Sequence, residues 1–438
     1  MHSRTLALLA VTILLAILAW PVLGSGVRVH AARPTPAAVL PDYLYRDKTV
    51  SFYEMRVRRD PADQISARLL AGQYMQRFRE SGDIDDVKRS MLQARRSIAL
   101  QPANNITAYE ILASAEMALH QFKAALRDEQ RAHLGRPDDT NAIAQIASVE
   151  MELGHYQAAH RILVPAVQKN ASDSGLLAVL ARYDELTSNM SDARPLIDRA
   201  SVIDDSIIDN SAQGRAWFHY RRGELAFAVG ASDEAKQDER DALGIFPKFA
   251  QAYNALARFC WATKDWHCAQ DAATKGAAIV PLPETLGYKA DAQTALGDSA
   301  GARETQDLIV AIERIGNAYR VSDRLLAVYY AEHGMRLDSA LQIARRETRL
   351  RGDEIYAQDT LAWAAAMDGH WLEARAAMRK AVRYDTEDAR LQYHAGIVAL
   401  HFGDHAEAKL RLNRALSLNP QFHPKYADDA RRELARLQ

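Results

Sequence analysis

Cys260 and Cys268 are the only cysteines of the chain, and they stand on either side of the turn of one predicted helical hairpin. Two antiparallel helices place such positions at a Cα–Cα separation of about 5–6 Å, which suits a disulfide. An oxidising compartment would close that bond, and two buried free thiols are the alternative interpretation. There is neither a C-x-x-C redox motif nor a zinc-type cysteine spacing.

Histidines spaced for one helical face are the other group that suggests chemistry. His401 and His405 stand four apart, with His394 upstream, and two such imidazoles can bind a metal. Gly403 interrupts that face, so we expect solvated turn histidines instead. No H-E-x-x-H motif, glycine-rich phosphate loop or nucleophile elbow occurs. The sequence therefore predicts a non-enzymatic protein with no cofactor and no metal.

The charge of the chain is almost balanced, with 55 Lys and Arg against 56 Asp and Glu in 438 residues. A net charge of -1 does not supply the positive field that nucleic-acid binding requires, so we expect no nucleic-acid partner. The length is too great for one compact core, which favours either several domains or a one-dimensional stack.

The N-terminal segment has the pattern of export. Residues 5–24 contain no charged residue and follow Arg4, as in a signal peptide or a membrane anchor. Both interpretations of residues 1–24 stay open. Residues 25–42 are then predicted to be a linker. The chain is expected to be exported, either periplasmic or anchored in the inner membrane, with membrane contact only through this segment.

Small residues recur along the rest of the chain with a period of about 34 residues, which is the strongest pattern present. One slot, which begins with Ala113, is Ala or Gly in eight of nine units, with Val328 as the exception. A second slot, 12 residues after the first, is Ala in every unit. These alanines are Ala125, Ala159, Ala193, Ala235, Ala269, Ala302, Ala340, Ala374 and Ala408.

Close helix packing explains the spacing of these residues. Two antiparallel helices joined by a short turn approach closely only where both carry small side chains. The first slot falls on the first helix of each hairpin and the second slot on the next helix, across turns such as Leu153-Gly154-His155. Pro165 lies inside one predicted second helix and should kink it. The stretch 205–213 fits no repeat.

The pattern resembles the tetratricopeptide repeat. The run Tyr253-x2-Leu256-Ala257-x2-Cys260, followed by Ala269 and Pro281, has that family's order of aromatic, leucine, small and proline positions, except that Cys260 replaces an aromatic residue. The resemblance implies an all-α solenoid, a right-handed superhelix of about ten hairpins over residues 62–422. Residues 43–61 and 423–438 are the expected N-terminal and C-terminal cap helices.

The resemblance also implies a concave groove lined by the first helix of each hairpin. Aromatic and arginine side chains, which commonly anchor interfaces, gather there in the later repeats. The groove residues so predicted are Trp217, Tyr220, Phe227, Asn254, Arg258, Trp261, Tyr329, Tyr356, Asp359, Trp363 and Tyr393.

Three functions are compatible with these features. The first is a cell-envelope scaffold that binds a partner protein or peptide in the groove. The second is a structural component of a secretion or polysaccharide-export assembly, an analogy of fold and location alone. The third is a small-ligand or metal-binding protein. Neither the partner nor the oligomeric state follows from the sequence.

Overall fold

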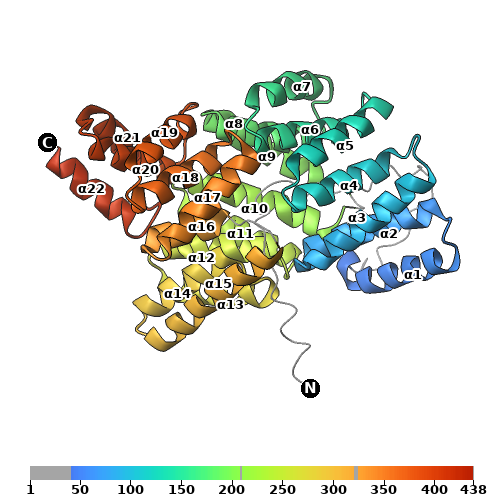
Figure 1. Ribbon diagram of the computed structural model, residues 1–438, viewed down its shortest axis with the longest axis horizontal. Coiled ribbons are helices and arrows are strands. Elements are labelled where there is room, and N and C mark those ends of the chain that lie inside the picture. The colour runs from blue at the N-terminus through green and yellow to red at the C-terminus, as the bar shows by residue number, and fades with distance from the viewer. Residues whose placement is uncertain (1–40, 208–209, 320–323, 438) are drawn as a thin grey trace.

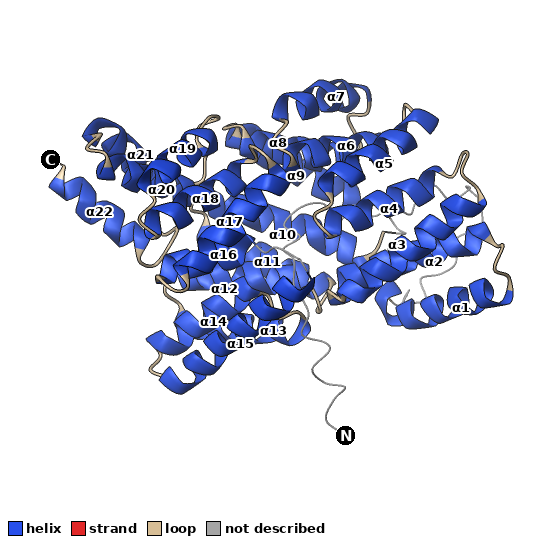
Figure 2. Cartoon of the chain, in the orientation of Figure 1, coloured by secondary structure: helices blue, strands red, loops and turns tan. Residues whose placement is uncertain are grey.

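A computed structural model describes residues 41–437 apart from 208–209 and 320–323. The signal or anchor segment predicted at residues 1–24 lies outside these residues, as does most of the linker at 25–42. Within the described ranges, no helix is both long and apolar enough to cross a membrane. Every regular element described there is a helix, as the all-α prediction requires (Figure 2).

Ten antiparallel hairpins follow one another along the described chain, each with a first helix (A) and a second helix (B) (Figure 1). The pairs are α2 (Gln64–Ser81) with α3 (Ile84–Leu100), α4 (Ile106–Ala118) with α5 (Phe122–Gly135), α6 (Thr140–Glu152) with α7 (Tyr156–Lys169), α8 (Ser174–Leu186) with α9 (Met190–Asp205), α10 (Ala212–Ala228) with α11 (Ser232–Ile245), α12 (Ala250–Ala262) with α13 (Trp266–Ile279), α14 (Pro283–Ala295) with α15 (Ser299–Tyr319), α16 (Arg324–His333) with α17 (Leu337–Arg351), α18 (Ile355–Met367) with α19 (Trp371–Ala381), and α20 (Ala389–His401) with α21 (His405–Leu418).

Single helices flank the hairpins at both ends. A 3-10 turn, η1 (Asp42–Tyr45), and α1 (Arg46–Arg59) precede α2, and α22 (Tyr426–Arg436) follows α21. Helix α7 continues through Pro165, which lies inside it. The stretch that fits no repeat, 205–213, holds the last residue of α9 and the first two of α10.

The periodic small residues lie where the A and B helices meet. All nine second-slot alanines are on B helices and are at most 4% exposed. The first-slot glycines show why size matters: a Cβ added at Gly223 of α10 would lie 2.5 Å from Glu239 Oε1 of α11. The helix packing inferred from the sequence is therefore the packing observed, and the prediction of a tetratricopeptide-type solenoid is confirmed at the level of the fold.

The solenoid also contacts itself between segments that are far apart in sequence. Turns between A and B helices in the earlier hairpins meet the junction loops that join later hairpins. Thr386 Oγ1 donates to the Leu186 carbonyl (2.7 Å), the Ile355 amide to Tyr156 Oη (3.2 Å), and Asn419 Nδ2 to the Phe227 carbonyl (2.7 Å). These contacts form a seam at which successive turns of the superhelix touch, so that the later helices lie alongside the middle of the chain (Figure 1).

A buried ionic network occupies the same seam. Arg351, at the end of α17, forms an ion pair with Glu347 at 2.9 Å and another with Glu152 of α6. Its guanidinium also lies 4.5 Å from the ring centroid of Phe122. A charge buried this deeply is tolerated only when it is paired, so the network favours one alignment of the two turns over others.

The seam can be tested with two glycines that differ only in what surrounds them. Gly154 and Gly369 both follow an A helix with positive φ, at 75° and 80°. A Cβ at Gly154 would lie 2.5 Å from the Asp353 backbone carbon, whereas one at Gly369 would meet nothing within 4 Å.

We predict that Gly369→Ala costs about 1 kcal/mol, the cost of a left-handed non-glycine residue. Gly154→Ala should cost about 1–3 kcal/mol more, since it also overpacks the seam. Urea denaturation followed by circular dichroism measures both. Equal shifts of the two midpoints would show that the seam is not formed in solution.

Candidate functional site

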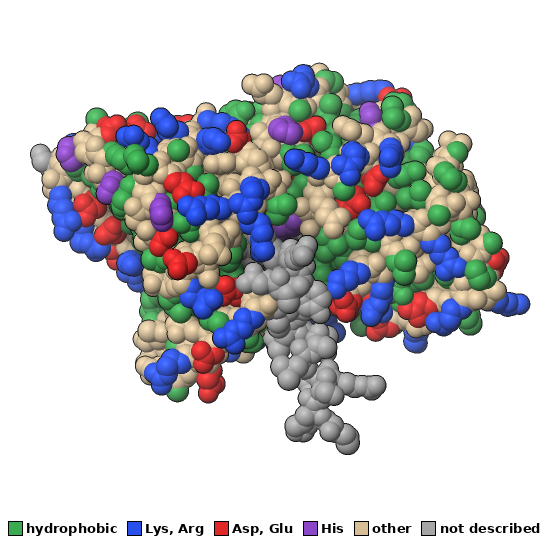
Figure 3. All heavy atoms as spheres, viewed as in Figure 1, with side chains coloured by type: hydrophobic (Ala, Val, Ile, Leu, Met, Phe, Trp, Pro, Cys, Tyr) green, Lys and Arg blue, Asp and Glu red, His purple; other side chains and the backbone are tan. Residues whose placement is uncertain are grey.

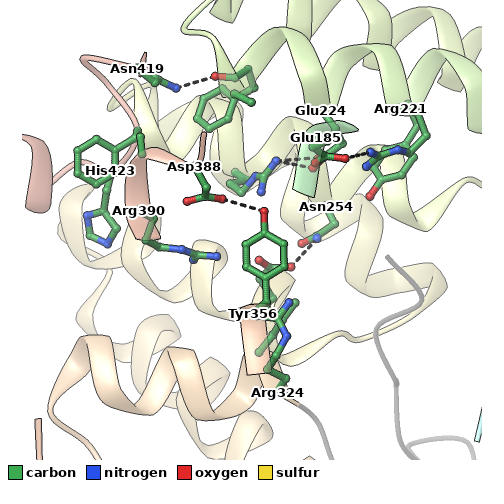
Figure 4. Close-up of a pocket in the computed structure, with 18 of the residues that line it drawn as sticks. Glu185, Arg221, Glu224, Asn254, Arg324, Tyr356, Asp388, Arg390, Asn419 and His423 are labelled. Atoms are coloured by element: carbon green, nitrogen blue, oxygen red, sulfur yellow. Dashed lines mark hydrogen bonds and ion pairs between the residues drawn. The ribbon is translucent and has the colours of Figure 1, made fainter. Parts of the chain in front are cut away.

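A cavity of about 180 Å³, partly open to solvent, lies between the concave side of the A helices and the seam (Figure 4). Its walls come from A helices α8, α10, α12, α14, α16, α18 and α20. Loop residues Asn419, Phe422 and His423, together with Arg351, complete it from the seam. The interior is strongly polar, because arginines and carboxylates alternate with aromatic rings along these walls.

The eleven groove residues predicted from the sequence divide into two groups. Those that line the cavity are Tyr220, Phe227, Asn254, Arg258, Trp261 and Tyr356. Those that do not are Trp217, Tyr329, Asp359, Trp363 and Tyr393. The six that line it come from α10, α12 and α18, so the structure brings together side chains from hairpins that are far apart in sequence.

Three residues of the second group take part in packing near the C-terminus. Trp363 is 2% exposed and stacks on His394 at 4.0 Å between ring centroids, while Tyr393 stacks on Tyr426 of α22 at 4.6 Å. Asp359 accepts a hydrogen bond from His394 Nδ1 at 2.9 Å, with the ring nitrogen as donor. The C-terminal helix α22 therefore covers the stripe that α18 and α20 would otherwise present to the groove.

Trp217 and Tyr329 pack against other residues, away from the cavity lining. Trp217 is half-buried and its ring meets that of Phe218 edge-on at 5.1 Å. Tyr329 of α16 packs against Gly287 of α14, where an added Cβ would lie 2.7 Å from the tyrosine ring. Neither is among the residues that line the cavity.

Ion pairs organise one wall of the cavity. Glu185 lies 2.8 Å from Arg182 and 2.5 Å from Arg221, and Glu224 lies 2.8 Å from Arg258. Burial acts to raise the pKa of Glu185, but the two arginines outweigh it and hold this pKa below its ordinary value. These three arginines therefore already form ion pairs with carboxylates of the protein itself.

A tyrosine between two arginines forms the facing wall. The guanidinium carbons of Arg182 and Arg324 each lie 5.5 Å from the ring centroid of Tyr356, and its hydroxyl donates to Asp388 Oδ2 at 3.3 Å (Figure 4). Arg324 reaches Thr360 Oγ1 at 3.5 Å but has no carboxylate partner within the described chain. Its charge is the one that a ligand in the cavity can meet most directly.

The third wall is aromatic, and it ends in hydrogen-bonded contacts that join Trp261, Asp291 and His333. Trp261 packs at 5.0 Å from Tyr288 and 4.5 Å from His423, measured between ring centroids. Its Nε1 donates to Asp291 Oδ2 at 2.8 Å, and His333 Nε2 lies 2.8 Å from Asp291 Oδ1. Asp291 therefore holds the indole in one orientation.

Several lining residues were not predicted from the sequence. Tyr288 and Arg390 lie on A helices near the phase of Asn254 and Tyr356, so the same repeat register would have identified them. Arg351, Asn419 and His423 lie outside the A helices. They reach the cavity only through the seam, and no periodic signal marks them.

The two cysteines are joined by a disulfide, with their Cα atoms 5.7 Å apart. It ties the end of α12, which carries Asn254, Arg258 and Trp261, to the start of α13. Of the two interpretations left open by the sequence, the structure has the bonded cysteines, next to three of the residues that line the cavity.

The three histidines that could have formed a metal site have different environments. His394 is buried against Asp359, His401 stacks on Trp371 at 3.6 Å between ring centroids, and His405 is exposed. None of them belongs to a group of potential metal ligands among the described residues.

Comparisons with known proteins give likenesses of shape alone. No family model matches the chain and no curated protein matches its sequence. Cut9, from the APC/C hetero-tetramer Cut9–Hcn1, is 14% identical, with 90% of this chain and 93% of that one covered and a TM-score of 0.34. The type IV pilus biogenesis factor PilW is 16% identical, covering 48% and 93%, with a TM-score of 0.40.

A tetratricopeptide repeat protein from Parabacteroides merdae is also 16% identical, with 61% of this chain and 95% of that chain covered and a TM-score of 0.40. Scores at this level do not carry an argument about function. What the chain does must therefore be inferred from its own residues.

The contact between Asp291 and His333 predicts that the stability of the fold depends on pH. Burial acts to lower the pKa of His333, but the hydrogen bond to Asp291 outweighs it, so the pKa lies above the ordinary 6.5. A pKa raised by folding gives a stabilisation that is complete below 6.5 and is lost as the pH rises through the folded value.

We predict that the melting temperature falls between pH 6 and pH 9 by more in the native chain than in His333→Gln, which keeps a donor but does not titrate. Differential scanning calorimetry across this range measures the difference. Parallel curves for the two proteins would contradict the assignment.

Proposed function

We propose that the chain is a non-catalytic scaffold of the cell envelope that holds an extended segment of a partner protein in the interior cavity. The observation that carries the proposal is the cavity itself. It is lined by side chains from seven A helices, and its arginine and aromatic residues are of the types that anchor protein interfaces.

The size of the cavity favours a segment over a folded surface. About 180 Å³, bounded by helices and by the seam and partly open to solvent, accommodates the side chains or the end of an extended segment and is too small for a globular domain. Entry from one end of the superhelix, or a transient opening of the seam, would deliver such a segment. An extended peptide contributes little tertiary structure of its own, so its affinity comes from anchors such as Arg324, Tyr356 and Trp261.

The charge of Arg324 indicates which side chain the segment presents. Its guanidinium has no carboxylate partner in the described structure, whereas Arg182, Arg221 and Arg258 have one each. We therefore expect an acidic residue of the partner against Arg324. The apolar N-terminal segment of the sequence supports an envelope location, and so does the disulfide, since such bonds persist in oxidising compartments.

Charged side chains of both signs lie on the face shown in Figure 3. There, Lys and Arg are interspersed with Asp and Glu over the described residues. Mixed charge of this kind is typical of a solvated surface.

Site-specific photo-cross-linking in the producing cells tests the proposal. A benzophenone amino acid replaces Phe422, which lines the cavity and is aromatic already, or Arg349, which is exposed on α17. We predict that position 422 gives a recurrent cross-link to one protein, mapped by mass spectrometry to a short segment, and that position 349 does not.

Adding Arg324→Glu should lower that cross-link yield at least tenfold, the equivalent of about 1.4 kcal/mol, by placing like charges together. Helicity should not change, because the substitution breaks no ion pair with a described residue. Arg349→Glu is the matched charge reversal and should have no effect. Equal cross-linking from both positions, or none from position 422, would contradict the cavity as the binding site.

A further inference from the structure

A second cluster of potential ligands lies between α9, α10 and α11, where their side chains meet away from the residues that line the cavity. His219 of α10 and Asp238 and Asp241 of α11 each place one potential ligand atom within 4.8 Å of the others. Asp205, the last residue of α9, brings its Oδ2 to 3.7 Å from His219 Nε2. Three helices thus contribute to one small volume.

Two atoms of this cluster are buried without a hydrogen-bond partner in the described structure. They are Oδ2 of Asp238, a residue 4% exposed, and Nδ1 of His219. Buried polar atoms are nearly always satisfied, so each such atom calls for a partner. A divalent cation is a partner that a carboxylate oxygen and an imidazole nitrogen can share.

The charges around the cluster also favour a cation. The carboxylates of Asp205, Asp238 and Asp241 lie near His219. The nearby positive charge of Arg222 pairs with Asp238 and also with Asp198. Arg222 divides its contacts between Asp198 Oδ1 at 2.9 Å and Asp238 Oδ1 at 3.3 Å. The carboxylates therefore outnumber the arginine that faces them, and Oδ2 of Asp238 has no hydrogen-bond partner in the described structure.

We propose that His219, through Nδ1, and Asp238 and Asp241 bind a divalent transition-metal ion of the zinc class, while Asp205 faces the other imidazole nitrogen, Nε2, and orients the ring. A nitrogen ligand among carboxylates selects zinc-like ions over calcium and magnesium, which prefer all-oxygen sites. Zinc takes ligand atoms at about 2.0–2.2 Å, so the cluster has to contract around the ion. Asp241, which accepts from Gln237 at 2.9 Å, is exposed, so its carboxylate can rotate inward.

The role of this ion would be structural. It would tie the B helix α11 to the A helix α10, which carries the cavity residues Tyr220, Arg221, Glu224 and Phe227. The site goes beyond the proposed scaffold function and stands or falls independently of it. The sequence did not reveal it, because its members come from three helices and share no motif spacing.

Isothermal titration of the full chain with zinc chloride in the absence of reducing agent tests the proposal. We expect one zinc ion per chain, with affinity lowered at least tenfold in both His219→Ala and Asp238→Asn. Circular dichroism checks that each variant keeps its helices.

His155→Ala is the matched control for the loss of an imidazole. His155 is an exposed histidine that pairs with Glu150 at 2.8 Å, and it belongs to neither group of potential metal ligands. Its removal should therefore leave the zinc affinity equal to that of the native chain.

The cysteines require a control of their own, because Cys260, Asp265 and Cys268 form the other group with metal-ligand atoms in proximity. Their sulfurs are occupied while the disulfide is intact, so a Cys260→Ser, Cys268→Ser double variant should bind zinc as the native chain does. The absence of zinc binding by the native chain, native affinity in His219→Ala, or loss of binding only in the double cysteine variant would each overturn the proposal.

Discussion

The contact between two successive turns of the superhelix is the constraint on which the interior of this protein depends. Periodic alanines and glycines bring each A and B helix together, and this alone would give an open spiral with an accessible groove. Hydrogen bonds such as Thr386 to Leu186 and Asn419 to Phe227, separated by 200 and 192 residues, join one turn to the next. They bound the cavity on the side of the seam, where Asn419 is among its lining residues.

The chemistry of that seam favours alignment more than it adds stability. Arg351 is buried between Glu347 and Glu152, and removing such charges from water offsets much of their attraction. A shift of one turn against the other would leave a buried charge unpaired, which is far more costly. Pairing also governs the arginines inside the cavity. Most of them already form ion pairs with carboxylates, so a ligand can form a new ion pair only with Arg324 among the described arginines there.

The repeat register in the sequence was sufficient to predict the hairpins. Small side chains at the contact between the A and B helices are a local requirement that recurs in every unit. It also placed Tyr220, Asn254, Arg258 and Tyr356 on the inner side. It did not anticipate that α22 would cover Trp363 and Tyr393, since nothing periodic says where a cap helix docks. No pattern in a single sequence marks the contacts between distant hairpins that bring Arg351 and His423 to the cavity. Nor does any pattern mark the cluster around His219, whose members come from three helices.

The seam joins hairpins whose A helices line the cavity, and the disulfide ties one of these helices, α12, to α13. Closure in solution is measured most directly by electron paramagnetic resonance with spin labels at His155→Cys and Asp353→Cys, two exposed positions whose neighbouring backbones meet at Gly154. The native cysteines are paired and do not react with the label. We expect strong dipolar broadening that persists when the labelled chain is diluted with unlabelled protein. Spectra equal to the sum of the two single-label spectra would show an open superhelix and contradict the seam.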